Sequence, residues 1–171
     1  MKRNRPSLYL DTNVLSALRY DGGSIQGMHR RLLTREWWGI ERKHFAVFAS
    51  QFTETELKRG EYPGQEEALA EVRRLPYLSY IKEVDRTAEV FVDSGVVPRG
   101  QFSDAIQLAF ATVYVIDYLL TWNYAHLMNP EVQLRVSEIN GRLGIRTPLI
   151  ESPESMPKIS FGQRIRRKSR K

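Results

Sequence analysis

The chain has 171 residues, of which 42% are hydrophobic and 27% are charged, with a formal net charge of +6 and no cysteine. This length and composition are typical of one globular domain, and the lack of cysteine excludes disulfide bonds, iron–sulfur clusters, Cys-ligated zinc and a thiol nucleophile. No apolar run approaches the roughly 20 residues that span a bilayer, and the N-terminal segment lacks the apolar core of a signal peptide, so we expect a cytoplasmic protein.

Short apolar runs alternate with amphipathic stretches along the chain. The runs at 8–10, 45–49 and 118–121 predict buried strands, and 77–82 and 148–150 are weaker strand candidates. This alternation predicts an α/β fold with a mainly parallel sheet, in which functional groups gather at the carboxyl ends of the strands. Helical periodicity predicts helices from Thr12 to the turn at 21–23 and over 24–43, 53–59, 65–75, 87–95, 103–113 and 131–140, with Ser103 as an N-cap.

The positive charge is concentrated at the two ends of the chain. Setting aside ten terminal cations reduces the 26 Lys and Arg residues to 16, against 20 Asp and Glu, so residues 6–157 have a net charge of −4. We therefore expect one domain over 1–157 and a basic, flexible tail over 158–171. The tail could bind a polyanion such as nucleic acid or be only a solvated segment, and both interpretations stay open.

Acidic side chains follow the predicted strands. Asp11 ends the first apolar run, Glu54 and Glu56 lie on the helix after the second, and Asp104 lies in the first turn of an apolar helix. Taken singly, Asp11 and Asp104 are each explained by helix capping and the helix dipole. Three carboxylates within about 5 Å would repel by roughly 3 kcal/mol per pair at an effective dielectric near 20. Their convergence therefore predicts a cation, and oxygen ligands suit Mg²⁺ or Mn²⁺ in phosphodiester hydrolysis.

The segments that contain these acids resemble four motifs of PIN-domain nucleases. The first is Leu8–Asn13, in which Asp11 ends a strand, and the second is 50–60, SQFTETELKRG. The third is 103–105 followed by Leu-Ala, and the fourth is 117–123, DYLLTWN. The closing stretch from Glu138 to Pro153 is similar to the VapC-like toxin branch of this family.

The resemblance covers roughly residues 8–156 and implies a single PIN-like domain over 1–157. It also implies a metal-dependent endoribonuclease, the toxin of a type II toxin–antitoxin pair, with RNA as substrate, a small antitoxin as partner and a homodimeric state. Asp11, Glu56 and Asp104 would be the Mg²⁺ or Mn²⁺ ligands. The spacing from the serine at the start of the second motif selects Glu56 and leaves Glu54 as a surface neighbour.

One position departs from the family pattern. Many PIN domains have aspartate where this chain has Asn123, and an amide brings one fewer negative charge. We assign Asn123 to the catalytic site only as an orienting or water-binding group. The departure also keeps open an alternative function, a catalytically weak or inactive PIN-fold module that binds RNA or protein. Asp117 precedes its strand and is interpreted as structural. The side chains expected to hold the carboxylates by hydrogen bonds are Thr12, Asn13, Ser50 and Thr121.

Overall fold

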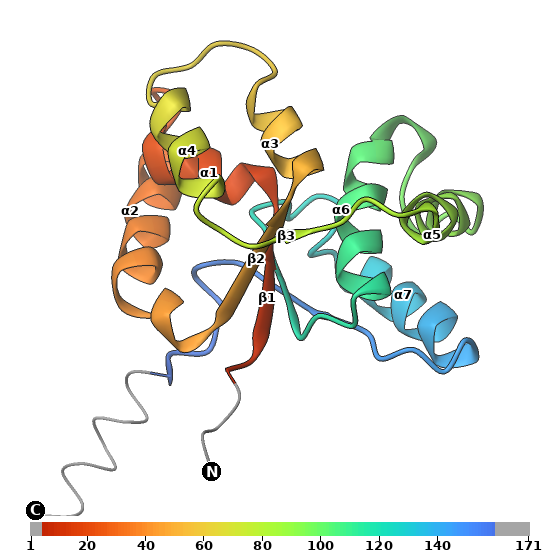
Figure 1. The fold of residues 1–171 in the computed structure, drawn as a ribbon. Coiled ribbons are helices and arrows are strands. Elements are labelled where there is room, and N and C mark those ends of the chain that lie inside the picture. The colour runs from red at the N-terminus through yellow and green to blue at the C-terminus, as the bar shows by residue number, and fades with distance from the viewer. Residues whose placement is uncertain (1–4, 160–171) are drawn as a thin grey trace, which may run out of the picture.

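The computed structural model describes residues 5–159 and contains a five-stranded parallel β-sheet between two layers of helices (Figure 1). The predicted α/β fold with a mainly parallel sheet flanked by helices is confirmed. The strands are β1 (Ser7–Leu10), β2 (Ala46–Ser50), β3 (Tyr77–Leu78), β4 (Tyr118–Leu120) and β5 (Leu149–Glu151), in the order β3-β2-β1-β4-β5. The helices are α1 (Thr12–Arg19), α2 (Ile25–Ile40), α3 (Gln51–Leu57), α4 (Gln65–Val72), α5 (Lys82–Asp93), α6 (Phe102–Val113) and α7 (Pro130–Arg142), with 3₁₀ turns at Arg42–His44 and Arg99–Gln101.

The alternation of side chains along β1 divides the hydrophobic core in two. Leu8 and Leu10 pack with residues of α1, α2 and α4, whereas Tyr9 packs on the other face with residues of α5, α6 and α7. Figure 1 shows these two groups of helices on opposite sides of the sheet. Because helices cover both faces of the sheet, successive residues of the central strands are apolar apart from a serine at the start of β1 and another at the end of β2. The strands could therefore be recognised as short continuous apolar runs.

The carboxyl ends of the three central strands meet at one edge of the sheet. Strand β1 pairs in parallel with β2 on one side and with β4 on the other, at Tyr9 with Phe48 and at Leu10 with Leu120. Helices α1 and α3 begin directly after β1 and β2. The polar residues that follow these strands are therefore brought to the same edge, as expected for parallel α/β sheets.

Two elements differ most from the predicted bounds, whereas the ends of the other helices shift by at most three residues. The strand expected at 77–82 is only two residues long, because β3 pairs with β2 at Tyr77 and Leu78 alone. Helix α5 begins at Lys82 rather than at 87. Its buried residues Val84, Ala88 and Phe91 have helical spacing, so the earlier start follows from packing against α6 and not from a capping residue, since Ile81 makes no side-chain cap.

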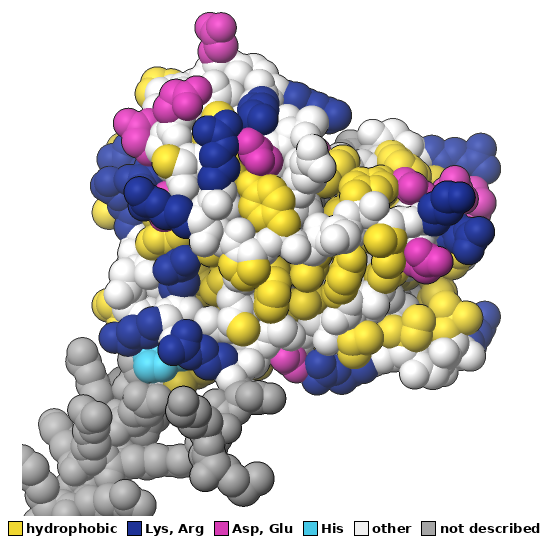
Figure 2. All heavy atoms as spheres, in the orientation of Figure 1, with side chains coloured by type: hydrophobic (Ala, Val, Ile, Leu, Met, Phe, Trp, Pro, Cys, Tyr) yellow, Lys and Arg dark blue, Asp and Glu magenta, His cyan; other side chains and the backbone are white. Residues whose placement is uncertain are grey.

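Hydrophobic side chains also gather on the surface near the β3 edge, as the space-filling view shows (Figure 2). Tyr77, Tyr80 and Ile81 from this part of the chain are each more than a third exposed. Between residues 5 and 159, no helix is both long and apolar enough to cross a membrane. Of the basic tail expected over 158–171, only Lys158 and Ile159 lie within the described residues, and Ile159 packs against the core on the α1 side of the sheet.

Candidate active site

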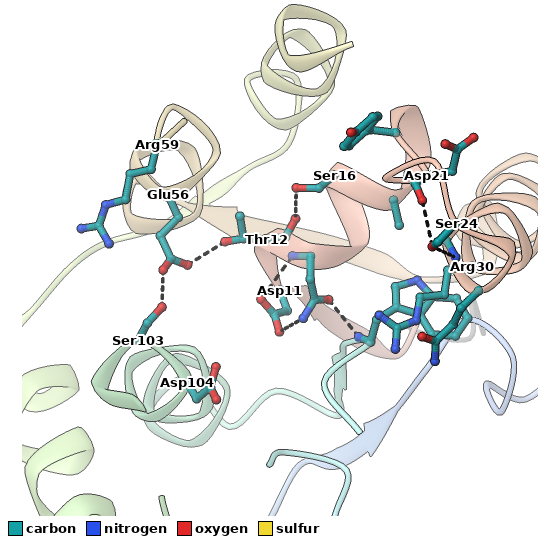
Figure 3. Close-up of a pocket in the computed structure, with 16 residues that line it drawn as sticks. Asp11, Thr12, Ser16, Asp21, Ser24, Arg30, Glu56, Arg59, Ser103 and Asp104 are labelled. Atoms are coloured by element: carbon teal, nitrogen blue, oxygen red, sulfur yellow. Dashed lines mark hydrogen bonds between the residues drawn. The ribbon is translucent and has the colours of Figure 1, made fainter. Parts of the chain in front are cut away.

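Four carboxylates line one hollow at the carboxyl end of the sheet (Figure 3), and one of them, Asp21, is paired with Arg31 at 2.8 Å. Asp11 follows β1, Glu56 lies on α3, and Asp104 lies in the first turn of α6. The hollow has a volume of about 520 Å³. In the close-up, Glu56 and Arg59 lie on one side of Asp11, and Arg30 lies on the other. The three acids selected from the sequence are thus brought to one place.

Asp11 is held almost completely buried at the start of α1, with 5% of its surface exposed. Its Oδ2 accepts hydrogen bonds from Asn13 Nδ2 at 2.7 Å and from Thr121 Oγ1 at 2.6 Å. Burial raises the pKa of Asp11 from 3.8 to about 7; the hydrogen bond from Thr121 opposes the rise, and the charges of Asp104 and Glu56 add to it. The fold therefore maintains a carboxylate whose negative charge is poorly compensated by its protein neighbours.

Glu56 is fixed by three donors from two other elements. Thr12 Oγ1 donates to its Oε2 at 2.8 Å, and the Ser103 hydroxyl donates to Oε1. Gln107 Nε2 donates to the same Oε2 at 2.8 Å and also lies 3.0 Å from Thr12 Oγ1. Because α1 and α6 both contribute donors, the position of Glu56 is defined across the hollow rather than by α3 alone.

Two of these donors were not predicted from the sequence. Ser103 was expected to cap α6, but the helix begins at Phe102 after Gln101, which makes no side-chain cap, and the Ser103 hydroxyl instead bonds Glu56. Gln107 is buried, with 1% of its surface exposed. A readable signal was present, since Gln107 is the one polar residue among positions 105–111 of a helix that is otherwise apolar there.

Asp104 and Asn123 form a second pair of site residues. Asn123 Nδ2 donates to Asp104 Oδ2 at 2.8 Å, while Asn123 Oδ1 accepts from the backbone N–H of His126 at 3.1 Å. Burial raises the pKa of Asp104, the hydrogen bond from Asn123 and the charge of His126 lower it, and the charge of Glu56 raises it again. Asn123 thus orients Asp104 through its amide. Oδ1 of Asp104 accepts no hydrogen bond from residues 5–159.

Arg30 and Arg59 bring positive charge to the rim of the acidic hollow. Neither forms an ion pair with any residue in the described part of the chain. An unpaired guanidinium is a planar donor suited to phosphate oxygens. The hollow therefore combines buried negative charge with positive charge available at its mouth.

Two other acids lie away from the hollow, as the sequence predicted. Glu54 makes ion pairs with Lys58 and Arg73, both at 2.9 Å; the hydrogen bonds from Lys58, Arg73 and Tyr77 lower its pKa to about 2. Asp117 binds the backbone N–H and hydroxyl of Ser7 at the opposite end of the sheet. Both acids are satisfied by local partners, which makes them structural.

Three of the four expected supporting side chains contact a carboxylate. Thr12 bonds Glu56, whereas Asn13 and Thr121 bond Asp11. The prediction was wrong for Ser50. Its hydroxyl caps α3 by accepting from Thr53 N at 3.1 Å and shares a 2.7 Å hydrogen bond with the buried Tyr9 hydroxyl.

The oxygen donors of the hollow fit a hard divalent cation in their chemistry. Asp104 Oδ1 is free of hydrogen bonds from residues 5–159, and the only one on Asp11 Oδ1 is a long 3.4 Å contact from Asn13 N. Both oxygens of Glu56 accept hydrogen bonds. Within residues 5–159, no group of three acidic or imidazole side chains forms a ready-made metal cluster. Metal binding by the three acids therefore stays a prediction.

Solved structures that resemble this chain were found, whereas sequence comparisons found none. No family model matches the chain, and a search of curated proteins finds no match. The structure is similar to that of VapC20 from Mycobacterium tuberculosis, described as a toxin that cleaves the sarcin–ricin loop. The two have a TM-score of 0.47 and 18% sequence identity, over 70% of this chain and 92% of the other.

Proposed function

We propose that the chain is an endoribonuclease that requires a divalent cation, Mg²⁺ or Mn²⁺, and hydrolyses RNA phosphodiester bonds. The observation that carries the proposal is the convergence of Asp11, Glu56 and Asp104 on one hollow that Arg30 and Arg59 also line. Carboxylates are the ligands that such cations prefer, and arginines bind phosphate oxygens. The resemblance of four sequence motifs to PIN-domain nucleases supports RNA as the substrate.

The side chains of the hollow have distinct roles in this proposal. Asp11, Glu56 and Asp104 would hold the cation, which, when bound, lowers the pKa of a water molecule and neutralises charge on the phosphate. Asn123 orients Asp104 by its 2.8 Å hydrogen bond. Arg59, beside Glu56, is placed to bind the RNA backbone near the scissile phosphate.

The proposed biological role is that of the toxin of a type II toxin–antitoxin pair. Its partners would be an RNA substrate, a small antitoxin protein and a second copy of this chain. The hydrophobic side chains gathered near the β3 edge support an assembly that covers this surface, because monomers rarely expose large contiguous apolar patches (Figure 2). A cytoplasmic location remains a prediction from the sequence.

The direct test is incubation of the purified chain with a panel of structured and single-stranded RNAs, with Mg²⁺ or Mn²⁺ and with chelator. We expect cleavage at defined sites in the presence of either cation and none with chelator. Cleavage that is unaffected by chelator would contradict the metal requirement. The association with an antitoxin is tested separately, by co-expression with the product of an adjacent small open reading frame.

A second candidate function is a PIN-fold module that binds RNA or protein with little or no catalysis. It is favoured by the hydrogen-bonded state of Glu56 and by the absence of a ready-made metal cluster among residues 5–159. Binding of the RNA panel without cleavage, at any concentration of Mg²⁺ or Mn²⁺, would support this candidate over the nuclease.

We expect Gln107→Leu to lower the cleavage rate by about 10- to 100-fold, the usual cost of losing a side chain that orients a metal ligand. The substitution removes the amide that donates to Glu56 and Thr12, and it replaces glutamine by an apolar side chain of similar size that suits the buried position. Thr112→Val is the matched control, because Thr112 lies on the same helix, is 1% exposed, and its hydroxyl has no hydrogen-bond partner among the described residues. Equal rates for the two variants, at equal thermal stability, would show that Gln107 does not position Glu56.

If the basic tail contacts RNA phosphates, deletion of residues 160–171 should weaken RNA binding and flatten its dependence on salt. The deleted segment contains six Lys and Arg residues and lies outside the described residues. Contacts of all six with single-stranded phosphates would contribute a slope of about 4 in log Kd against log salt. The truncation retains Ile159, which packs on the core. Fluorescence anisotropy over a series of salt concentrations measures the slope, and an unchanged slope would assign the tail to solubility alone.

A further inference from the structure

A second hollow adjoins the acidic one and differs from it in chemistry. It has a volume of about 740 Å³ and is lined by residues that include Gln26 and Tyr124. Asn13, Gln26, Arg30 and Trp122 line both hollows, so the two lie side by side. A strand of RNA with one phosphate at the carboxylates can therefore place its neighbouring nucleotide at the second hollow. This inference rests on the proposed function and concerns how the same site holds its substrate.

Arg30 and two aromatic rings form a wall of the second hollow. The Arg30 guanidinium carbon lies 5.8 Å from the ring centroid of Trp122 and 5.9 Å from that of Tyr124. The ring centroids of Trp122 and Tyr124 are 6.1 Å apart, at an interplanar angle of 53°. Cation–π attraction holds the guanidinium beside these rings without consuming its capacity to bind a phosphate.

The two aromatic residues are fixed differently. Trp122 is 3% exposed, and its indole N–H donates to Thr34 Oγ1 at 2.9 Å, which makes it a rigid support. Tyr124 is 44% exposed, and its hydroxyl hydrogen-bonds Ser152 and Glu154, both at 3.2 Å. A ring that is anchored through its hydroxyl and accessible elsewhere loses little conformational freedom when a flat ligand stacks on it.

The polar groups of the second hollow suit the edge of a nucleobase better than an apolar protein segment. Gln26 lines it with an amide that makes no hydrogen bond within residues 5–159 and can both donate and accept. The amides of Asn13 and Asn123 also line it but are already bonded, to Asp11 and Asp104 respectively. Unpaired bases in RNA are recognised by stacking on aromatic rings together with hydrogen bonds to their edges. A base in a duplex has its faces covered by its neighbours and cannot stack in this way.

We propose that the second hollow binds an unpaired nucleobase of the RNA next to the scissile phosphate, with the base stacked on Tyr124 and the neighbouring phosphate bound by Arg30. The hollow thereby selects substrates in which the nucleotide beside the cleavage site is unstacked. Tyr124 acts in binding the RNA and takes no part in the chemical step.

Binding of short fluorescently labelled single-stranded RNAs, measured by anisotropy with and without Mn²⁺, tests the subsite independently of cleavage. We expect Tyr124→Ala to raise the Kd by about 5- to 150-fold, the range for loss of stacking on one base, and Tyr124→Phe to bind within a few-fold of wild type. Tyr80→Ala is the matched control, because Tyr80 is 43% exposed and its hydroxyl likewise bonds a carboxylate, that of Asp85. Circular dichroism melts establish that the variants are folded.

Abasic substitution at each position of the RNA identifies the base that stacks. Wild type should lose affinity when one particular base is removed, and Tyr124→Ala should show no further loss at that position. If RNA is bound in this Tyr124-dependent way but not cleaved, the subsite stands and the nuclease proposal fails. If RNA is cleaved but Tyr124→Ala and every abasic substitution leave Kd and KM unchanged, the subsite is overturned and the nuclease stands. Failure of wild type to bind any of the RNAs would overturn both.

Discussion

We expect Asp11→Asn and Glu56→Gln to lower the rate of RNA cleavage at least about 100-fold, more than the 10- to 100-fold typical of residues that merely orient a metal ligand. Each substitution removes one negative charge from the hollow and changes the side chain by a single group. The buried position of Asp11 and the three hydrogen-bond donors around Glu56 hold these carboxylates where the cation is proposed to bind. Single-turnover cleavage of one RNA at saturating Mn²⁺ measures the loss.

Glu54→Gln is the control for this prediction. Glu54 lies on the same helix two residues before Glu56, but its carboxylate is directed to Lys58, Arg73 and Tyr77. We expect cleavage by Glu54→Gln within a few-fold of wild type, with some loss of stability from the broken ion pairs. A loss of activity in Glu54→Gln as large as that in Glu56→Gln would contradict the assignment of Glu56 to the site.

We also expect Asp11→Asn to stabilise the protein at neutral and alkaline pH when no divalent cation is present. Burial raises the pKa of Asp11 from 3.8 to about 7, so ionising this group costs the folded state on the order of a few kcal/mol. Asparagine removes the charge, can keep an oxygen facing the donors of Asn13 and Thr121, and is a favourable N-cap residue. Since each kcal/mol moves the Tm of a chain of this size by about 2–4 °C, we expect a rise of at least about 5 °C.

The difference in stability between wild type and Asp11→Asn should grow with pH. Because the folded pKa of Asp11 lies above the unfolded value, ionisation of Asp11 costs wild type stability as pH rises from about 4 to about 7, and this contribution is absent from Asp11→Asn. The Tm difference should therefore be small near pH 4 and complete above about pH 7. Thermal melts at several pH values, with chelator present, measure it.

Added Mn²⁺ should act against this difference in Tm between wild type and Asp11→Asn. A cation that binds only the folded state stabilises it by mass action, so Mn²⁺ at neutral pH should raise the Tm of wild type more than that of Asp11→Asn. A destabilised Asp11→Asn at neutral pH with chelator, or an equal Mn²⁺ effect on both proteins, would contradict the interpretation of Asp11 as a poorly compensated charge.

Much of the fold could be predicted from the sequence because its strands are short, apolar and buried on both faces. The runs at β1, β2 and β4 coincide with the predicted strands within one residue. The prediction of a strand over 77–82 was too long because Tyr80 and Ile81 are hydrophobic but lie partly exposed between β3 and α5. Local sequence reports hydrophobicity, whereas the length of β3 is decided by how far it can pair with β2.

The acidic residues of the candidate site could be predicted from the sequence, but two of the side chains that donate hydrogen bonds to them could not. Asp11 and Asp104 follow from strand ends and helix starts, positions that can be read along the chain. The hydrogen bonds of Ser103 and Gln107 to Glu56 join residues 47 and 51 positions apart. Such contacts depend on how the fold places α6 opposite α3 across the hollow, and a polar residue on an apolar helix is only an indication that one exists. The pairing of Arg30 with Trp122 and Tyr124 is likewise a product of tertiary packing.

A divalent cation in the acidic hollow is the central requirement of the proposed RNA cleavage. This requirement is tested most directly by the initial rate of cleavage of one RNA as a function of Mn²⁺ concentration, for wild type and Asp104→Asn side by side. Asp104→Asn preserves the size of the side chain while removing its charge. We expect a saturable rise in cleavage rate with Mn²⁺ for wild type and no Mn²⁺-dependent cleavage for Asp104→Asn. Identical titration curves for the two folded proteins would contradict it.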